Sequence, residues 1–261
     1  MQLITFLLLI VNIVWSVLLY NFEPTHVSNW NYLYNFGYGL NYLLAAGLSF
    51  SYLKKYTSAR PALMFFGVGF LLFFIAQVIW VYYNVIANLP VPYPGPADFF
   101  WLLFYVMMGI GFFLLLANIK STFSPANLLE TIVSSGVIFL LLSSFLSLNN
   151  TQYGLPLLTQ FLNYAYPLAD AILISLSIVT LRTQTGHLHA YLLFFIFGFM
   201  SLAVGDTLFA YQTTLETYWN GNITDVAYSF AGFLLLLGAI NLPRLLDSTH
   251  THDLTPKTNL T

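Results

Sequence analysis

The sequence contains no cysteine and very little charge: seven Lys and Arg and nine Asp and Glu among 261 residues, or 6%. The absence of cysteine excludes disulfides, thiolate metal sites and a cysteine nucleophile. So few charges cannot cover the surface of a soluble domain, in which about 25% of residues are charged. A formal net charge of −2 also leaves no basic surface for a nucleic acid partner.

Apolar residues are what the chain has in excess, since 59% of it is hydrophobic and 18% aromatic. A membrane-spanning helix needs about 20 mostly apolar residues. Eight stretches meet this requirement: 2–20, 31–53, 61–87, 98–118, 128–148, 157–181, 190–211 and 224–243. The sequence therefore predicts an all-α integral membrane protein with eight transmembrane helices arranged as repeated helical hairpins. We expect a single polytopic domain over 1–243 and a short disordered cytoplasmic tail over 244–261.

The first stretch resembles a signal peptide only in its position. Its segment Met1–Ile10 has no basic residue, and no small-residue cleavage site follows Tyr20. We therefore expect a retained helix.

The basic residues give an independent test of the span count. With eight spans, all of them fall in loops or tails on one side of the membrane, and this side is cytoplasmic by the positive-inside rule. They are Lys54, Lys55, Arg60, Lys120, Arg182, Arg244 and Lys257. The sequence thus predicts a multi-pass protein of the inner (cytoplasmic) membrane, with both termini in the cytoplasm and the lipid bilayer as its first partner.

The even-numbered spans begin alike, with a polar residue followed by aromatic residues in register. The polar residues are Asn31, Asp98, Thr159 and Asp225. This register predicts a hairpin repeated about four times. Asn, Asp and Thr are also favoured helix N-caps, so Asp98 and Asp225 can be read either as caps or as ligand contacts.

Two acids lie within the predicted spans, Asp170 near the middle of 157–181 and Asp206 near the outer end of 190–211. An ionisable group in a membrane usually faces the bundle interior or a water-filled cavity. Asn41, Gln77 and Asn163 lie at similar depths in the outer half. These groups either line a pocket or only join helices by hydrogen bonds.

We expect a ligand pocket in the outer half of the bundle, with apolar walls and a few polar groups. Its predicted residues are Asp170, Asp206, Gln77, Asn41, Trp80, Tyr166 and Tyr211. No Lys or Arg lies within a span, so the acids must be protonated, share a proton, be hydrogen-bonded or meet a cationic ligand. A cationic ligand would also be attracted to aromatic ring faces.

The sequence identifies no cofactor, and it favours no metal site. Two His-x-His pairs, His187 with His189 and His250 with His252, lie in a loop and in the tail. No acid cluster accompanies them, so they are weak candidates for metal ligands.

Three motifs in order resemble the multi-span membrane sensor regions of prokaryotes. They are Trp80-Val-Tyr-Tyr-Asn with Pro92-Tyr-Pro-Gly-Pro-Ala-Asp-Phe-Phe-Trp-Leu-Leu-Phe-Tyr105, then Tyr164-Ala-Tyr-Pro-Leu-Ala-Asp170, then Gly205-Asp-Thr-Leu-Phe-Ala-Tyr211. Such regions stand ahead of GGDEF diguanylate cyclase, EAL phosphodiesterase or histidine kinase domains. The resemblance covers residues 70–243 and departs at Val106, where the family usually has proline. It implies a sensory, ligand-binding module that signals to a separate or missing cytoplasmic output partner.

Two other classes stay open. Two intramembrane aspartates, with Gly205-Asp206 as the local similarity, also resemble the YhhN-type lysoplasmalogenases, which implies an intramembrane lipid hydrolase using Asp170 and Asp206. Inward-facing acids and hairpin repeats would also suit a small-solute transporter. We favour the non-enzymatic sensor and assign no catalytic residue.

Overall fold

The computed structural model describes residues 1–89, 92–118, 124–148, 154–183 and 189–251. Within these ranges every regular element is helical. The α-helices are α1 (Gln2–Phe22), α2 (Asn29–Ser51), α3 (Arg60–Val81), α4 (Pro96–Asn118), α5 (Pro125–Leu148), α6 (Leu157–Thr183), α7 (His189–Thr214) and α8 (Ile223–Thr251). A short 3-10 helix, η1 (Tyr52–Lys54), follows α2, and a π-helical turn, η2 (Tyr82–Ile86), continues α3.

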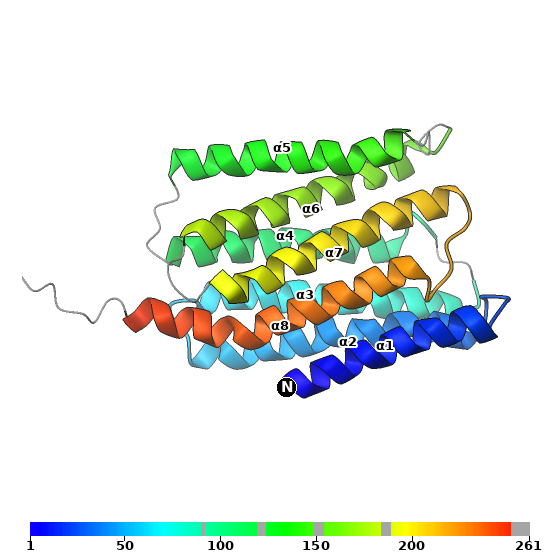
Figure 1. The fold of residues 1–261 in the computed structure, drawn as a ribbon, viewed down its shortest axis with the longest axis horizontal. Coiled ribbons are helices and arrows are strands. Elements are labelled where there is room, and N and C mark those ends of the chain that lie inside the picture. Colours follow the sequence, from blue (N-terminus) through cyan, green and yellow to red (C-terminus); the bar gives the residue numbers. More distant parts are fainter. Residues whose placement is uncertain (90–91, 119–123, 149–153, 184–188, 252–261) are drawn as a thin grey trace, which may run out of the picture.

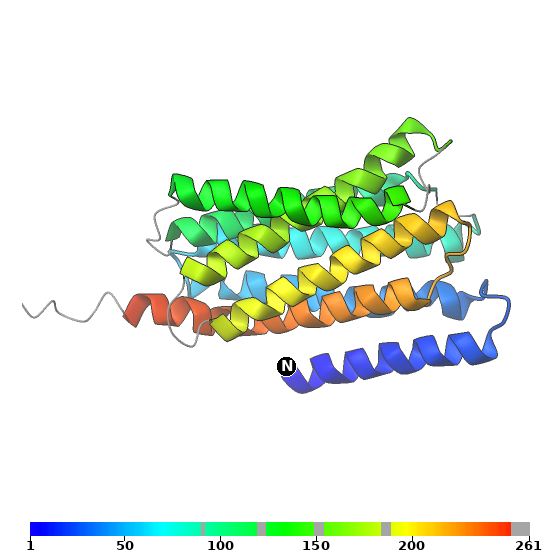
Figure 2. The same cartoon turned by 45° about the horizontal axis from the view of Figure 1, so that its top comes forward.

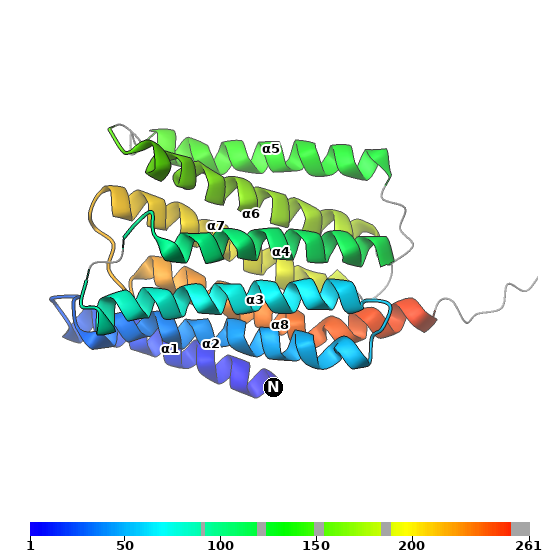
Figure 3. The ribbon, with the colours of Figure 1, turned by 180° about the vertical axis from the view of Figure 1, so that it is seen from behind.

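Six of the helices form a closed ring. In order, α2 packs on α3, α3 on α4, α4 on α6, α6 on α7, α7 on α8, and α8 on α2. Figure 1 shows α7 and α8 on one side of the bundle, and Figure 3, drawn from behind, shows α3 and α4 on the other. The polar groups of the ring helices can therefore meet inside it.

The remaining helices, α1 and α5, lie outside the ring. The first packs on α2 and α8, and the second on α6 and α7. In Figure 2, α1 runs along the lower edge of the bundle, far from α5. Both helices expose most of their large apolar side chains, such as Leu3, Phe6, Leu140 and Leu141. This surface suits lipid, because water would penalise its exposure.

Seven helices are long and apolar enough to cross a membrane, in agreement with the predicted all-helical multi-pass class. They are α1, α3 with η2, α4, α5, α6, α7 and α8. The helix positions follow the predicted spans to within a few residues at most ends. Two differences stand out. The helix α2 is too polar to meet the same criterion, and α8 continues to Thr251, past its predicted end at residue 243.

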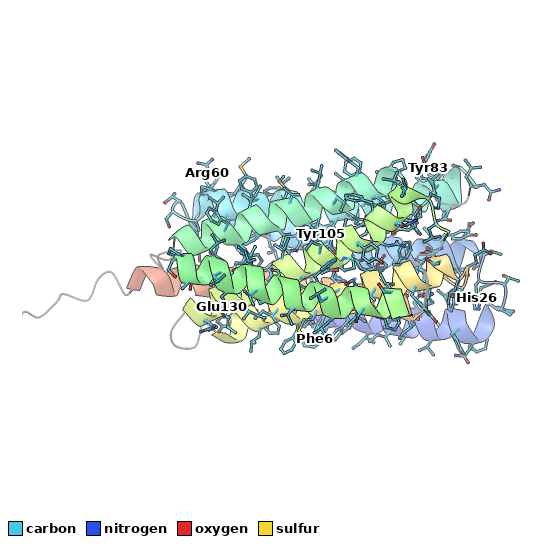
Figure 4. All side chains as sticks on the ribbon, turned by 90° about the horizontal axis from the view of Figure 1, so that it is seen from above. Phe6, His26, Arg60, Tyr83, Tyr105 and Glu130 are labelled. Carbon is cyan, nitrogen blue, oxygen red and sulfur yellow. The ribbon has the colours of Figure 1, made fainter. Side chains whose placement is uncertain are left out.

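The even-numbered helices all begin at one end of the bundle and run to the other (Figure 1). The end where they finish carries the described basic side chains Lys54, Lys55, Arg60 and Arg182. We call it the basic end and the opposite one the acidic end. Figure 4 shows Arg60 and Glu130 at the basic end, His26 and Tyr83 at the acidic end, and Tyr105 between them. The Arg182 guanidinium donates to the Glu130 carboxylate and joins α6 to α5. Lys120 and Lys257 lie outside the described residues.

The polar residues that occupy matching positions near the starts of the even-numbered helices form a similar hydrogen bond in three of the four cases. The side chains of Asn31, Asp98 and Asp225 accept hydrogen bonds from backbone N–H groups of the preceding loop. The donors are Ser28 (3.2 Å), Gly95 (2.7 Å) and Gly221 (2.6 Å). Such back-bonds satisfy N–H groups that a helix start leaves free. The fourth residue, Thr159, is buried at the start of α6.

Gly221 shows why one of these loops needs glycine. Its φ of +97° is one that other L-residues rarely adopt, and a Cβ would lie 2.5 Å from Leu19 Cδ1. Its carbonyl accepts a hydrogen bond from Ser16 on α1 (2.6 Å). The loop between α7 and α8 is thereby fixed against α1 while its N–H faces Asp225.

The ring consists of two halves with the same order of packing, although the outer helices differ: α1 packs on α2 and α8, and α5 on α6 and α7. In α1–α4 and again in α5–α8, the last three helices pack consecutively in the ring and the first lies outside. Several residues recur at a nearly constant separation. The matched pairs are Asn35 and Asn163, Tyr38 and Tyr166, Gln77 and Asp206, Trp80 and Phe209, and Asp98 and Asp225. The repeat visible in the packing thus contains four helices, and both copies have the same orientation.

Closure of the ring between α2 and α8 can be tested by cross-linking. A Cβ at Gly232 would lie 3.2 Å from Asn41 Cβ, close to the separation of about 3.5–4.5 Å in disulfides. Because the native chain has no cysteine, Asn41→Cys with Gly232→Cys should form one disulfide under a membrane-permeant oxidant. Mass spectrometry of proteolysed protein would detect the linked peptides.

The control for this experiment pairs Asn41→Cys with Gly136→Cys on α5. A Cβ at Gly136 would have no neighbour within 4 Å among the described atoms, so this pair should stay reduced. Equal cross-linking of both pairs, or none in the first, would contradict the packing of α2 on α8.

Candidate functional site

A cavity of about 40 Å³ lies inside the ring towards its acidic end. All six ring helices contribute to its wall, together with the loop before α8. The lining residues are Asn35, Tyr38, Phe73, Gln77, Trp80, Asp98, Trp101, Tyr105, Tyr166, Asp206, Phe209, Tyr218 and Tyr228. They are aromatic rings, two amides and two carboxyl groups, without a basic side chain. By volume the cavity holds roughly three water molecules.

Three aromatic side chains separate this cavity from a wider depression at the acidic end. Trp80, Phe209 and Tyr218 line both spaces. Their ring centroids are 4.9 to 6.1 Å apart, and each pair meets edge to face. The indole Nε1 of Trp80 donates to Asn220 Oδ1 (2.7 Å), which fixes its ring. A molecule arriving from the acidic end would therefore meet these rings first.

One tyrosine joins the two acids that the sequence places inside the membrane. The Tyr105 hydroxyl lies 2.9 Å from Asp170 Oδ1 and 2.5 Å from Asp206 Oδ2. A phenol has one proton, so it can donate to only one of these oxygens. The second contact needs a protonated carboxyl that donates to the phenol oxygen. The group of Asp170, Tyr105 and Asp206 thus holds at least one carboxyl proton while this geometry persists.

Asp206 accepts a second hydrogen bond, from a tyrosine hydroxyl on α8. Tyr228 donates to Asp206 Oδ1 at 2.7 Å. The approach of this ring depends on Gly205, because a Cβ there would lie 2.6 Å from Tyr228 Cε1. Packing therefore explains why Gly205 precedes Asp206 in the third motif. The glycine leaves room for the Tyr228 ring, and the Tyr228 hydroxyl donates a hydrogen bond to Asp206.

Asp98 and Asp225 each combine a backbone bond with a tyrosine bond. Asp98 Oδ1 accepts from Tyr166 (2.7 Å), and Asp225 Oδ1 accepts from Tyr218 (3.0 Å). Burial, with the charge of Asp225 nearby, raises the pKa of the Tyr218 hydroxyl well above its usual value. Tyr218 is thus kept as a hydrogen-bond donor. Asp98 caps α4, as one of its two readings predicts, and it also lines the cavity.

A further tyrosine of the same kind lies in the loop before α4. The Tyr93 hydroxyl donates to Asn163 Oδ1 at 2.5 Å, and burial raises its pKa above the usual range. Asn163 is fully buried on α6. Four residues later, Pro167 supplies no N–H to the Asn163 carbonyl. The Tyr93 hydroxyl thus joins the loop before α4 to α6.

Two polar atoms of the cavity residues have no hydrogen-bond partner within the described part of the chain: Gln77 Oε1 and Trp101 Nε1. Gln77 is only 1% exposed. A buried polar atom left without a partner is costly, so such groups in native structures need an explanation. One is an acceptor and the other a donor, and both residues line the cavity.

Four of the seven residues predicted for the pocket line this cavity: Asp206, Gln77, Trp80 and Tyr166. Asp170 lies one layer behind them, reached through Tyr105. The other two lie elsewhere. Asn41 is fully buried against Gly232 of α8, outside the cavity wall. Tyr211 packs on Phe145 of α5, with ring centroids 5.3 Å apart.

The sequence reasoning did not assign several residues of the cavity wall. Asp98, Trp101 and Tyr105 are spaced so that they share one face of α4. Tyr228 follows Asp225 at the matching distance on α8. This helical spacing was the available signal, but aromatic residues are so frequent in the chain that it did not single these positions out.

Comparisons with protein-family models, with curated proteins and with solved structures gave no match. The residues described include no group of three His, Asp or Glu side chains placed to hold a metal ion. His187 and His252, one from each His-x-His pair, lie outside the described residues. Inference about function therefore rests on the cavity and its hydrogen bonds.

The role of the bridging hydroxyl can be tested with Tyr105→Phe. This change leaves two neighbouring carboxyl groups without their shared partner, which should cost about 1–3 kcal/mol of stability. We expect a lower midpoint of thermal unfolding in detergent, followed by intrinsic fluorescence. Tyr211→Phe is the matched control, and its midpoint should stay near that of the native chain. An unchanged midpoint for Tyr105→Phe would show that the bridge contributes nothing.

Proposed function

We propose that the chain is an eight-span membrane module that binds a small ligand in the outer-half cavity and signals to a partner at the basic end. The observation that carries this proposal is the cavity itself. It is enclosed by all six ring helices, lined by two carboxyl groups and aromatic rings, and lies beneath an open depression. Enclosed sites with apolar walls and a few polar groups are typical of small-molecule binding.

The eighth span of this proposal is α2. Its polarity comes from residues that face inwards, since Asn31, Asn35, Asn41 and Ser49 are all buried in the bundle. Its exposed large side chains are apolar, among them Phe36. At 23 residues it is about 34 Å long, enough to cross the hydrocarbon core of a bilayer. Mean hydropathy therefore understates how well its outer face suits lipid.

Side-specific labelling tests whether α2 crosses. Thr25 and Thr57 are exposed before and after this helix. In intact cells an impermeant maleimide should label Thr25→Cys and not Thr57→Cys, because the basic end is cytoplasmic. Thr57→Cys should react only after the membrane is permeabilised. Labelling of both variants in intact cells would contradict an α2 span and with it the eight-span count.

The hydrogen bonds around the cavity support a sensory role. They connect α4 to α6, α4 to α7, and α7 to α8, so a ligand that favours one arrangement of these helices shifts the whole bundle. The helix α8 begins beside the site, at Asp225 and Tyr228, and reaches the basic end (Figure 1). With 29 residues it is about 43 Å long. It connects the ligand site to the face where a cytoplasmic partner would bind.

The resemblance to prokaryotic sensor regions agrees with this placement. Each of the three motifs contributes to the cavity wall: Trp80 and Tyr105 from the first, Tyr166 from the second and Asp206 from the third. Residues that the resemblance selects along the sequence thus lie together around one site. This convergence supports the proposal that the same site does the sensing.

A fusion experiment tests signalling. The full chain would be joined through α8 to a diguanylate cyclase domain, with several linker lengths, and cyclic dinucleotide measured in cells. We expect Trp80→Ala, which opens the cavity wall, to change output several-fold with at least one linker. Tyr211→Phe serves as the control and should not. Output that stays constant for Trp80→Ala with every linker would contradict a sensory role.

A second candidate function is intramembrane lipid hydrolysis, and one observation favours it. Two carboxyl groups that share a proton through Tyr105 can act as acid and base toward a water molecule. If this is the function, purified protein should hydrolyse the vinyl-ether bond of a lysoplasmalogen, with water adding to release an aldehyde and a glycerophospholipid headgroup. Asp206→Asn should then lower the rate by about 10²–10⁴-fold. Hydrolysis that survives this substitution would exclude the pair as the catalyst.

A further inference from the structure

The charge distribution of the bundle is strongly polarised. Asp98, Asp206 and Asp225 lie in the half towards the acidic end, and Asp170 lies at the middle of α6. The described Lys and Arg side chains all lie at the other end. Among the cavity residues two are acids and none is basic. The potential inside the cavity is therefore negative whenever either lining acid is ionised, and it favours a cation.

An unpartnered atom gives a second and independent indication. Gln77 Oε1 is an acceptor without a partner among the described residues, and it belongs to a cavity-lining residue that is 99% removed from solvent. A hydrogen-bond donor from a ligand would satisfy it. Gln77 and Asp206 are also a matched pair of the two halves, so both copies of this position present an acceptor side chain at the cavity wall.

The aromatic walls narrow the class of cation. The rings of Trp80 and Trp101 lie 5.7 Å apart and both border the cavity. Indole and phenol faces attract organic cations, most strongly when the cation is desolvated. A quaternary ammonium would meet the rings but would leave Gln77 Oε1 without a donor. A primary ammonium satisfies both the rings and the acceptors.

The volume limits the size of the ligand. A cavity of about 40 Å³ accommodates a group of only a few heavy atoms. The wider depression above it shares Trp80, Phe209 and Tyr218 with the cavity, so a longer ligand could leave its tail there. The unpartnered Trp101 Nε1 is a donor and would suit a hydroxyl on the same molecule.

We infer that the cavity binds the head of a small primary alkylammonium ion, with Asp206 and Gln77 accepting its N–H groups and Trp80 and Trp101 forming its walls. This inference rests on the proposed ligand-binding function and names its ligand class. No covalent chemistry is involved. For three heavy atoms the dissociation constant should be of the order of 1 mM.

Titration of the full chain in nanodiscs tests this inference. Ethylammonium chloride is added at constant ionic strength against NaCl, and tryptophan fluorescence is followed because Trp80 and Trp101 border the site. We expect a saturable change with a dissociation constant in the millimolar range. Ethanol, which has the same number of heavy atoms and no charge, should bind at least tenfold more weakly. Tetramethylammonium, which has no N–H donor, should also be at least tenfold weaker.

Single substitutions at the two proposed acceptor residues test whether ethylammonium binds in this cavity. Asp206→Asn keeps the size and an acceptor oxygen, and Gln77→Leu removes the amide. Each should weaken ethylammonium binding at least tenfold while its unfolding midpoint shows that the protein is folded. Tyr211→Phe should bind as the native chain does. No saturable change in the native chain, tetramethylammonium or potassium binding as tightly as ethylammonium, or undiminished binding in both variants would overturn the inference.

The ligand class and the sensory function can fail separately. If ethylammonium does not bind while the cyclase fusion still responds to Trp80→Ala, the ammonium ligand is wrong. If ethylammonium binds as expected while the fusion output stays constant for that variant, the ammonium site stands and signalling is wrong.

Discussion

The pairing of aspartate carboxyl groups with tyrosine hydroxyl groups holds the acidic half of this bundle together. A carboxyl group inside an apolar bundle is costly unless hydrogen bonds replace those of water. Each of the four aspartates has a tyrosine partner: Asp98 with Tyr166, Asp170 with Tyr105, Asp206 with Tyr105 and Tyr228, and Asp225 with Tyr218. Because most of these bonds run between different helices, satisfying the acids also fixes how the helices meet.

This requirement explains where polar residues occur in so apolar a chain. Tyrosine suits the task, since its ring packs like an apolar side chain and only its hydroxyl needs a partner. The loops contribute as well, because Gly95 and Gly221 supply N–H groups to Asp98 and Asp225. The outer helices α1 and α5 contain no aspartate, and most of their large exposed side chains are apolar. Polarity therefore increases towards the cavity and decreases towards lipid.

The sequence was sufficient for the helices and for the depth of the site, but not for its full wall. Apolar runs long enough to span a bilayer can be counted, and the helices follow those runs. Depth along a helix can also be read from residue number, and Asp206, Gln77, Trp80 and Tyr166, which the sequence places at similar depths, line one cavity. The direction in which a side chain points cannot be read where all faces of a helix are apolar. Tyr211 has suitable depth, yet its ring points to Phe145.

The sequence predicts a helix at 31–53, close to the observed α2, but the length of the repeat was less accessible. Hydropathy averages over all faces of a helix, so Asn35 and Asn41 lower the mean for α2 although both side chains are buried in the bundle. The sequence shows the repeat first at the helix starts, because Asn31, Asp98 and Asp225 each cap a helix by accepting a hydrogen bond from a backbone N–H group that precedes it. The longer repeat of four helices appears only when packing order is known, since it pairs unlike residues such as Gln77 and Asp206.

That unlike pair makes the two halves of the cavity wall chemically different. In one half of the bundle the position holds a neutral amide, and in the other it holds an acid whose carboxyl shares Tyr105 with Asp170. When Asp206 is ionised, the phenol proton of Tyr105 serves Asp206 rather than Asp170. Asp170 then keeps its contact with Tyr105 by donating a carboxyl proton to the phenol oxygen. The hydrogen bonds that join α4, α6 and α7 therefore depend on how many protons this group holds.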